Sequence, residues 1–461
     1  MAEERSDEHE REEEDYRLDG DLVDRITDAA DSGEAERLAA LLEPLHAADI
    51  ADLLEQVSPA ERRDILRLWG REIDGEVLTE IDESIREEVI EALPKDVLAE
   101  AVRELDSDDV VDLIEDLEEP QQEAILEALD ETDRAAVEQS LTYPEYSAGR
   151  LMQREVVTAP EHWSVGETID FLRREDELPD QFYHVILVDP GHHPIGYVTL
   201  GKLLASKRDM ALTEITEDSF RTISAWQEEA DVAYAFNQYH LISAPVVDDH
   251  DRLVGVITID DAMAVLDEEH EEDILRLAGV GDESSITDSV LETVRQRLPW
   301  LGINMLTAVL ASSVIKLFEG TIGQIVALAV LMPIVASMGG NAGTQTLTVA
   351  VRALATKNLT QSNVWRVIRR EALVGLTNGA VFALCLGAVA WVWFGTPALG
   401  LVIAAAMVIN LFIAAVAGIA VPLVLEKLGA DPALASGTFV TTMTDVVGFF
   451  AFLGLATAVL L

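Results

Sequence analysis

Apolar residues recur at helical spacing from residue 20 to residue 146, with short polar turns between the runs. Within this stretch, Ser58-Pro-Ala-Glu61 has the pattern of a capping box with proline at the first helical position. A succession of short amphipathic helices predicts an all-α superhelical domain over residues 20–146. The mostly charged residues before it, 1–19, predict a disordered acidic tail and no signal peptide.

A different pattern follows, in which two apolar runs and the turn between them occur twice, 59 residues apart. The first copy holds Val185–Asp189 and Ile195–Thr199, and the second holds Ala244–Asp248 and Val254–Thr258. Short runs of this kind, bounded by turn residues, are typical of strands, and a helical pattern precedes each pair. The repeat predicts two α/β modules, residues 147–208 and 209–267, which pair with pseudo-symmetry.

Five segments of membrane length come next, each near the ~20 residues that a bilayer-spanning helix needs. They cover approximately residues 298–318, 322–351, 371–394, 398–425 and 434–460. The sequence therefore predicts a five-span α-helical transmembrane domain over residues 297–461, joined to the second module by an acidic connecting helix over 268–296. Basic residues flank the first segment and cluster between the second and third. The positive-inside rule then predicts a multi-pass plasma-membrane protein with cytoplasmic N-terminal domains and its C-terminus outside.

Charge separates the two halves of the chain. Residues 297–461 carry eight basic and five acidic residues, whereas residues 1–296 carry a net charge of −56, within a total of −53. A soluble half this acidic argues against nucleic acid and anionic lipid as its partners. Two explanations stay open for the acids: adaptation to a cytoplasm of high salt content, and specific cation binding. No catalytic motif appears, so we do not expect an enzyme, and the single cysteine, Cys385, excludes a disulfide within the chain.

The last apolar segment contains one charged residue, Asp445. A charge near the bilayer centre costs roughly 2.5–3.5 kcal/mol even on lenient scales, so it usually lines a polar path. Thr441 lies one turn earlier on the same face, and its carbonyl together with the carboxylate suits a hard cation such as Mg²⁺, which keeps several waters. One aspartate per chain is a weak site, and two chains sharing a pore would supply a pair. The alternatives are a protonated structural aspartate and a proton relay.

A second unusual feature is the sequence Met338-Gly-Gly-Asn341-Ala-Gly-Thr344, which follows Pro333 inside another apolar segment. Proline and three glycines weaken a helix, and broken backbone at membrane depth is tolerated where it faces protein or a water-filled cavity. We therefore expect a local break here, with Asn341 and freed carbonyls facing a hydrated ion. The alternative is close helix packing through small residues.

Other acids are candidates for a regulatory metal site. Asp108 and Asp112 share a helix face, Asp261 follows the last strand of the repeat, and Asp431 lies at the cytoplasmic edge of the membrane. The connecting segment adds Glu269, Glu272 and Asp273. Like charges so placed repel unless a divalent ion bridges them. For any one of them, the alternative is a solvated acid in an acidic protein.

The repeat resembles a pair of CBS domains. Gly255-Val-Ile-Thr258-Ile-Asp-Asp261 is similar to their G-x-x-T-x-x-D nucleotide-ribose motif, which implies ATP binding through Thr258 and Asp261. The first copy departs from that motif, because Lys202 replaces the aspartate.

The order of helical acidic domain, CBS pair, acidic connecting helix and five spans resembles the MgtE family of magnesium channels, here as an acidic, halophile-type member. The sharpest matches are Gly339-Gly-Asn341, Val351–Ala355, Ala430–Ala433 and Thr444–Gly448. The resemblance implies a homodimer in the lipid bilayer with one pore at the dimer interface, where the aspartate at position 445 holds hydrated Mg²⁺. It also implies that cytosolic Mg²⁺ bridges the helical domain, the CBS pair and the connecting "plug" helix through the seven acids named above, closing the pore. Ala264 and His240 stand where the family pattern has carboxylates, which implies fewer or weaker bridging ions.

Two rival functions stay open at this stage. One is a transporter of another divalent ion, such as Co²⁺ or Mn²⁺. The other is a membrane-tethered CBS sensor that moves no ion and relays ionic strength or nucleotide levels to a partner.

Overall fold

The computed structural model describes residues 18–461 except 116, 118, 176–177, 180, 218–219, 281–283 and 285–289. Residues 1–17 of the expected tail and part of the connecting segment therefore lie outside the described residues. The chain forms two compact units, which meet in sequence between Asp267 and Glu268.

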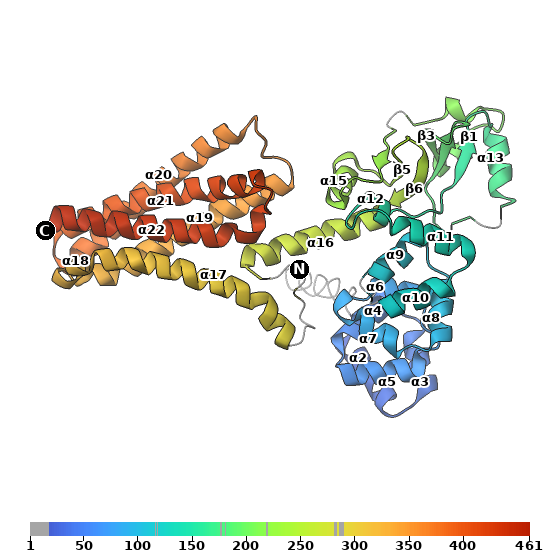
Figure 1. Ribbon diagram of the computed structural model, residues 1–461, viewed down its shortest axis with the longest axis horizontal. Helices are drawn as coiled ribbons and strands as arrows, with labels where there is room; N and C mark the ends of the chain where they lie inside the picture. The colour runs from blue at the N-terminus through green and yellow to red at the C-terminus, as the bar shows by residue number, and fades with distance from the viewer. Residues whose placement is uncertain are drawn as a thin grey trace, which may run out of the picture. The chain divides into compact units, whose positions relative to one another are not determined.

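The N-terminal part of the first unit is helical (Figure 1). Its helices are α2 (Gly20–Asp31), α3 (Ala35–Leu42), α4 (Ala47–Gln56), α5 (Pro59–Trp69), α6 (Gly75–Glu80), α7 (Glu83–Ala92), α8 (Lys95–Val102), α9 (Ser107–Glu115), α10 (Glu119–Ala128) and α11 (Glu131–Ser140). One apolar cluster runs through them, from Ile26 to Val137. The predicted all-α domain is therefore confirmed.

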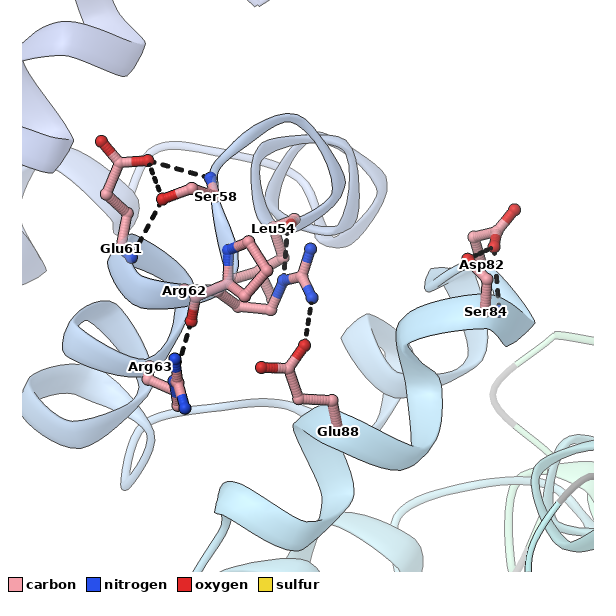
Figure 2. Close-up of polar contacts among 9 residues, drawn as sticks. Leu54, Ser58, Glu61, Arg62, Arg63, Asp82, Ser84 and Glu88 are labelled. Atoms are coloured by element: carbon pink, nitrogen blue, oxygen red, sulfur yellow. Dashed lines mark hydrogen bonds and ion pairs between the residues drawn. The ribbon is translucent and has the colours of Figure 1, made fainter. Parts of the chain in front are cut away.

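The local signals read from the sequence determine where α5 begins. Ser58 Oγ accepts from the backbone N–H of Glu61, whose carboxylate accepts from the N–H of Ser58, with Pro59 as the first helical residue. One turn later the guanidinium of Arg62 is 97% buried; it donates to the Leu54 carbonyl at 2.7 Å and to Glu88 at 2.6 Å (Figure 2). An arginine thus joins three helices inside this domain, α4, α5 and α7.

The second part of the first unit is the predicted repeat. Its elements are α12 (Ala148–Leu151), β1 (Thr158–Pro160), α13 (Val165–Leu172), β2 (His184–Val188), β3 (Pro194–Thr199), α14 (Leu200–Ala205), the 3₁₀ turn η1 (Leu212–Glu214), β4 (Ile223–Ser224), α15 (Glu229–Tyr239), β5 (Ser243–Val247) and β6 (Leu253–Thr258). Strands β2 and β3 pair antiparallel, as do β5 and β6, and a short parallel strand joins each pair, in the orders β1-β2-β3 and β4-β5-β6. Both hairpins recur at the 59-residue offset, which confirms the repeat and the predicted α/β class.

Helix α16 (Ile259–Ala278) follows β6 without interruption. The sequence predicted a connecting helix from residue 268, but this helix begins at Ile259, directly after the last strand. The helix continues from the last strand of the repeat, so no turn separates the repeat from the connecting segment at residue 268. The acidic residues that suggested a new element there form the middle of α16.

The second unit contains the membrane helices. They are α17 (Val290–Leu317), α18 (Glu319–Gln324), α19 (Ala327–Ala355), α20 (Val364–Phe394), α21 (Pro397–Lys427) and α22 (Pro432–Leu460). In the described part of the chain, five of these are long and apolar enough to cross a membrane, which confirms the predicted number. The third span begins at Val364 rather than at residue 371, because three arginines in its first turns lower the apolarity without ending the helix.

Candidate cation sites

Asp445 lies in the middle of α22 and is half-buried. Among the described residues, no hydrogen bond or ion pair engages its carboxylate. Two neighbouring threonines form hydrogen bonds within α22 itself. Thr444 Oγ1 donates to the Thr441 carbonyl at 2.9 Å, and Thr442 Oγ1 donates to the Thr438 carbonyl at 2.6 Å. The sequence suggested the Thr441 carbonyl as a cation ligand; because that carbonyl already accepts from Thr444, the exposed Thr441 hydroxyl is the better candidate.

Helix α19 packs against α22 beside this carboxylate. Gly340 is close to Thr441, since a Cβ on this glycine would lie 4.0 Å from the threonine methyl group. Asn341 is exposed, and its Nδ2 lies 3.4 Å from Ser337 Oγ. The adjacent helices therefore present an amide, a hydroxyl and a carboxylate. These are oxygen ligands of the kind that a hard, partly hydrated cation accepts.

The expected break in the Gly-rich segment is wrong. Helix α19 is continuous from Ala327 to Ala355 and contains Pro333. The glycines instead serve close packing, as in the alternative drawn from the sequence: a Cβ on Gly339 would lie 2.3 Å from Asn410, and one on Gly343 would lie 2.6 Å from Val440. Glycine allows this approach because it has no side chain, and neighbouring helices supply contacts that offset its weak helix propensity.

A second group of acids lies inside the first unit, where α9 meets the start of α16. Asp108 and Asp261 are partly buried and lie near one another. Burial, followed by repulsion from Asp261, raises the pKa of Asp108 well above its usual value. Burial raises the pKa of Asp261 to about 6. The hydroxyl and the backbone N–H of Thr258 donate to its carboxylate and partly offset this rise. Two carboxyls in this state favour a bound cation or a proton over an empty, ionised pair.

Sequence reasoning missed three members of this group. Burial and then Asp261 raise the pKa of Asp109 to about 7, and Asp106 and Asp260 also contribute repulsion to it. No sequence signal identifies them, because their proximity depends on how α9 packs against the repeat. Ser107 fixes that packing by donating its hydroxyl to Glu155 at 2.9 Å.

Asp112, predicted as a partner of Asp108, lies differently. Its carboxylate pairs with the buried guanidinium of Arg86 at 3.1 Å, and its side chain is 57% exposed. It still adds repulsion to Asp109, so it lies at the periphery of the group rather than inside it.

The third group of acids lies in the second unit, around Arg276 in the last turns of α16. Arg276 pairs with Asp431 and with Glu272, both at 2.8 Å. Burial raises the pKa of Asp273, as does repulsion from Asp431 and then Glu269, while Arg276 opposes the rise. The structure thus brings together the four acids predicted here: Glu269, Glu272, Asp273 and Asp431.

Neither the acids around Asp108 nor those around Arg276 form a complete metal-binding site. Among the described residues, no set of three or more His, Cys, Asp or Glu side chains has the geometry to hold a metal ion. The two departures from the family pattern are on the surface: Ala264 is exposed on α16, and His240 is the exposed, left-handed residue that ends α15.

The cleft between the two modules tests the expectation of ATP. His184 and Ser243, the equivalent positions of the two copies, are hydrogen-bonded across it. The cleft is lined by these residues and by Tyr183, Gln153 and Thr258, and its volume is about 20 Å³. That is room for about one water molecule. This cleft does not have room for a nucleotide, and Thr258 and Asp261 bond to each other instead.

Taken together, the described part of the chain, with five spans, an intramembrane carboxylate that has no partner there and an acidic unit with a CBS-like pair, defines a polytopic membrane protein of the cation-transporting class. Family models match in the same order: the MgtE intracellular N domain over residues 45–146, the CBS domain over 148–209 and 228–268, and the MgtE divalent cation transporter over 332–455.

Curated relatives agree with these matches. The chain is 33% identical over 319 residues to the magnesium transporter MgtE of Enterococcus faecalis, covering 69% of this chain and 70% of that protein. It is 34% identical over 317 residues to the magnesium transporter MgtE of Thermus thermophilus, covering 68% and 70%. The chain belongs to the MgtE family.

Solved structures are similar to the soluble part. One is the cytosolic domain of the Mg²⁺ channel MgtE in complex with ATP, 28% identical, with a TM-score of 0.49 over 53% of this chain and 99% of that chain. Another is the soluble part of a magnesium transporter, 20% identical, with a TM-score of 0.47 over 54% and 98%.

Proposed function

We propose that this protein is a Mg²⁺ channel of the plasma membrane that is closed by cytosolic Mg²⁺. Its family membership supports Mg²⁺ transport. The observation that carries the proposal for this chain is Asp445: a half-buried carboxylate in a membrane helix with no partner among the described residues. Such a group faces water or an ion.

The permeation site consists of Asp445, with Asn341 and Thr441 beside it. Mg²⁺ gives up its waters reluctantly, so a site made of one carboxylate and neutral oxygens suits its hydrated form better than a tight cage of acids. One carboxylate per chain is a weak site. Two chains that share one pore supply two, and we therefore infer a homodimer in the lipid bilayer, with the soluble unit in the cytoplasm and the C-terminus outside.

Closure follows from the two regulatory groups. A ligand shifts a conformational equilibrium through tighter binding to one state. The partly buried carboxyls of Asp108 and Asp261 repel one another when no cation is bound, as do the acids around Asp431, and a divalent cation that bridges each group removes the repulsion. Mg²⁺ therefore binds most tightly to the arrangement in which the acids are closest, which is the closed state. Falling cytosolic Mg²⁺ releases the groups and opens the pore.

Mg²⁺ influx into vesicles that contain the full-length protein tests this function. We compare the wild type with Asp445→Asn, which keeps the shape of the side chain and removes its charge, at low and at high internal Mg²⁺. Influx that depends on Asp445 and stops at high internal Mg²⁺ supports the gated channel. Influx that is indifferent to Asp445 moves the permeation site elsewhere, and influx that ignores internal Mg²⁺ rejects the gating.

The same vesicles separate the rival functions. Competition by Co²⁺ or Mn²⁺ at concentrations below that of Mg²⁺ would indicate a transporter of another divalent ion. A membrane-tethered CBS sensor would carry no influx and would keep its signal in Asp445→Leu. The Asp445 carboxylate, which has no partner in the part of the chain that the structure describes, argues against the sensor, because a membrane anchor does not require an intramembrane charge.

ATP at the CBS pair is a separate matter. Thr258 and Asp261 are the residues that would hold the ribose, yet the cleft that Thr258 lines has a volume of only about 20 Å³, and His184 and Ser243 are hydrogen-bonded across it. We derive no step of the transport cycle through a nucleotide. Thermal unfolding of the protein with and without ATP tests the point, since a nucleotide that binds the folded state raises the unfolding temperature.

A further inference from the structure

Asn410 is a polar residue at the centre of the most apolar membrane helix. It lies midway along the 31 residues of α21, and its side chain is fully buried. Its Nδ2 donates to the backbone carbonyl of Val335 on α19 at 2.8 Å. A buried amide at membrane depth has to be explained, because an apolar residue would fill the space without removing polar atoms from water.

The amide fits into a notch formed by two glycines on two other helices. A Cβ on Gly339 of α19 would lie 2.3 Å from Asn410 Nδ2, and a Cβ on Gly448 of α22 would lie 2.9 Å from the same atom. Contacts below 3 Å require an atom to shift, so a side chain at either position would displace the buried amide of Asn410 from its place. One side chain of α21 therefore touches α19 and α22 at the same height and sets the distance between them.

That height is the height of the proposed permeation site. Gly339 is two residues from Asn341, and Gly448 follows Asp445 by three residues, which places it one turn along the same region of α22. The Oδ1 atom of Asn410 is buried and has no hydrogen-bond partner among the described residues. Fold stability alone does not account for an amide that leaves a buried acceptor unsatisfied, because removing such a group can stabilise a protein.

We propose that Asn410 is a positioning residue for cation selectivity. By holding α19 and α22 at a fixed spacing, its amide fixes the distance between the Asn341 amide and the Asp445 carboxylate, and hence the size of the ion that both reach. The inference rests on the proposed function, since it needs Asp445 and Asn341 to line the path. Asn410 itself touches no ion.

The test is the ratio of Mg²⁺ influx to Ca²⁺ influx in vesicles that contain the full-length protein. In Asn410→Leu the hydrogen bond to Val335 is lost and a branched side chain faces the two glycines, so the spacing is no longer fixed. We expect the ratio to fall by about tenfold, the change that accompanies a modest loss of discrimination between two ions. Mg²⁺ influx itself should change much less, because Asp445 is intact.

Met407→Ala is the matched control. Met407 is also fully buried, three residues earlier on α21, and it packs in the apolar cluster; the atoms nearest to a Cβ on either glycine belong to Asn410 and not to Met407. Its truncation should lower the unfolding temperature at least as much as Asn410→Leu does and leave the ion ratio unchanged. An equal loss of selectivity in both variants would show that loosened packing alone is responsible and would overturn the inference.

Gly448→Ala provides a second route if Asn410→Leu fails to fold. It introduces a methyl group against the amide from the side of α22 and should lower the same ratio. Combining it with Asn410→Ala, which empties the notch, should restore part of the ratio. Wild-type selectivity in both Asn410→Leu and Gly448→Ala rejects the inference and leaves the channel standing. A wild type without any Mg²⁺ influx rejects the proposed function, and the inference with it.

Discussion

The guanidinium of Arg276 donates to the carboxylate of Asp431 at 2.8 Å, and joins the last turns of α16 to the first turn of α22. The other oxygen of Asp431 accepts from the backbone N–H of Ala433 at 2.6 Å and caps α22. Leu277, the next residue of α16, packs with Ala433 and Val440. A basic side chain therefore holds the connecting helix to the membrane helices at the position where the regulatory acids gather.

We predict that Arg276→Gln increases Mg²⁺ influx when internal Mg²⁺ is absent. The positive charge of Arg276 attracts Asp431 and Glu272 without any bound metal. Its removal should therefore destabilise the closed state of the channel. A partly exposed ion pair of this kind contributes about 1 kcal/mol, which corresponds to roughly a fivefold change in the population of the open state. Initial influx rates in vesicles loaded without Mg²⁺ measure the effect.

Arg252→Gln is the control for that prediction. Arg252 makes a similar pair with Asp248, at 2.7 Å, in a turn of the second CBS module. Its loss should leave influx unchanged. If Arg276→Gln instead closes the channel at lower internal Mg²⁺, the arginine competes with Mg²⁺ for Asp431 rather than holding the helix in place.

The membrane half shows how far the sequence alone leads. The five spans follow from length and apolarity, and both were visible in the sequence. The sequence did not show whether Gly339 breaks a helix or allows two helices to pack closely, because that depends on which side chain lies opposite the glycine. Here that side chain is Asn410, which is 71 residues away in sequence and unremarkable on its own.

The regulatory acids show the same limit. The sequence indicated which elements carry them, yet 85 acids leave too many candidates. Asp109 joins Asp108 and Asp261 through packing between α9 and the repeat, whereas Asp112 turns to Arg86. Helical spacing placed Asp108 and Asp112 on one face, but the element packed against that face determines that Asp108 is partly buried and Asp112 is exposed.

A dependence of stability on pH follows from these raised pKa values. The pKa of Asp109 is about 7 and that of Asp261 is about 6, against about 3.9 in an unfolded chain. Ionisation therefore costs more in the folded state. The contribution of these two groups to stability is therefore greatest below about pH 4 and is lost as the pH rises toward 7. We expect the unfolding temperature, measured without Mg²⁺, to fall across this window, and Mg²⁺ to raise it more at pH 7.5 than at pH 5.

The triple variant Asp108→Asn, Asp109→Asn, Asp261→Asn separates this effect from general repulsion in an acidic protein. It should flatten the decline between pH 4 and pH 7 and remove most of the difference that Mg²⁺ makes at the higher pH. Asp249→Asn, at an exposed position in the same unit, should do neither. An unchanged pH profile in the triple variant would place the titrating groups elsewhere.

Arg62 in the helical domain gives a prediction about stability alone. Its buried guanidinium bonds to the Leu54 carbonyl and to Glu88 (Figure 2). Arg62→Met keeps the apolar stem and removes both bonds, which leaves the Glu88 carboxylate without its counter-charge. We expect a loss of about 2–4 kcal/mol in the free energy of unfolding. Chemical denaturation measures it, with the neighbouring Arg63→Met as control.

Arg63 is exposed and donates to the Pro59 carbonyl within its own helix, so its loss should change stability by less than about 0.5 kcal/mol. Similar losses in both variants would mean that burial of the Arg62 guanidinium does not increase its contribution to the free energy of unfolding.

The packing of α20 on α21 gives the last prediction. A Cβ on Gly375 would lie 2.7 Å from the Leu411 carbonyl and equally close to the Ala415 methyl group. Backbone does not move aside as a flexible side chain does, so Gly375→Ala forces the two helices apart at a cost of about 1–3 kcal/mol. The unfolding temperature of the detergent-solubilised protein should fall. Gly302→Ala, on α17 with no atom within 4 Å of the added methyl group, should leave it unchanged. Alanine also forms helices better than glycine, so an equal fall in both variants would show that the close approach of Gly375 to α21 does not determine the effect.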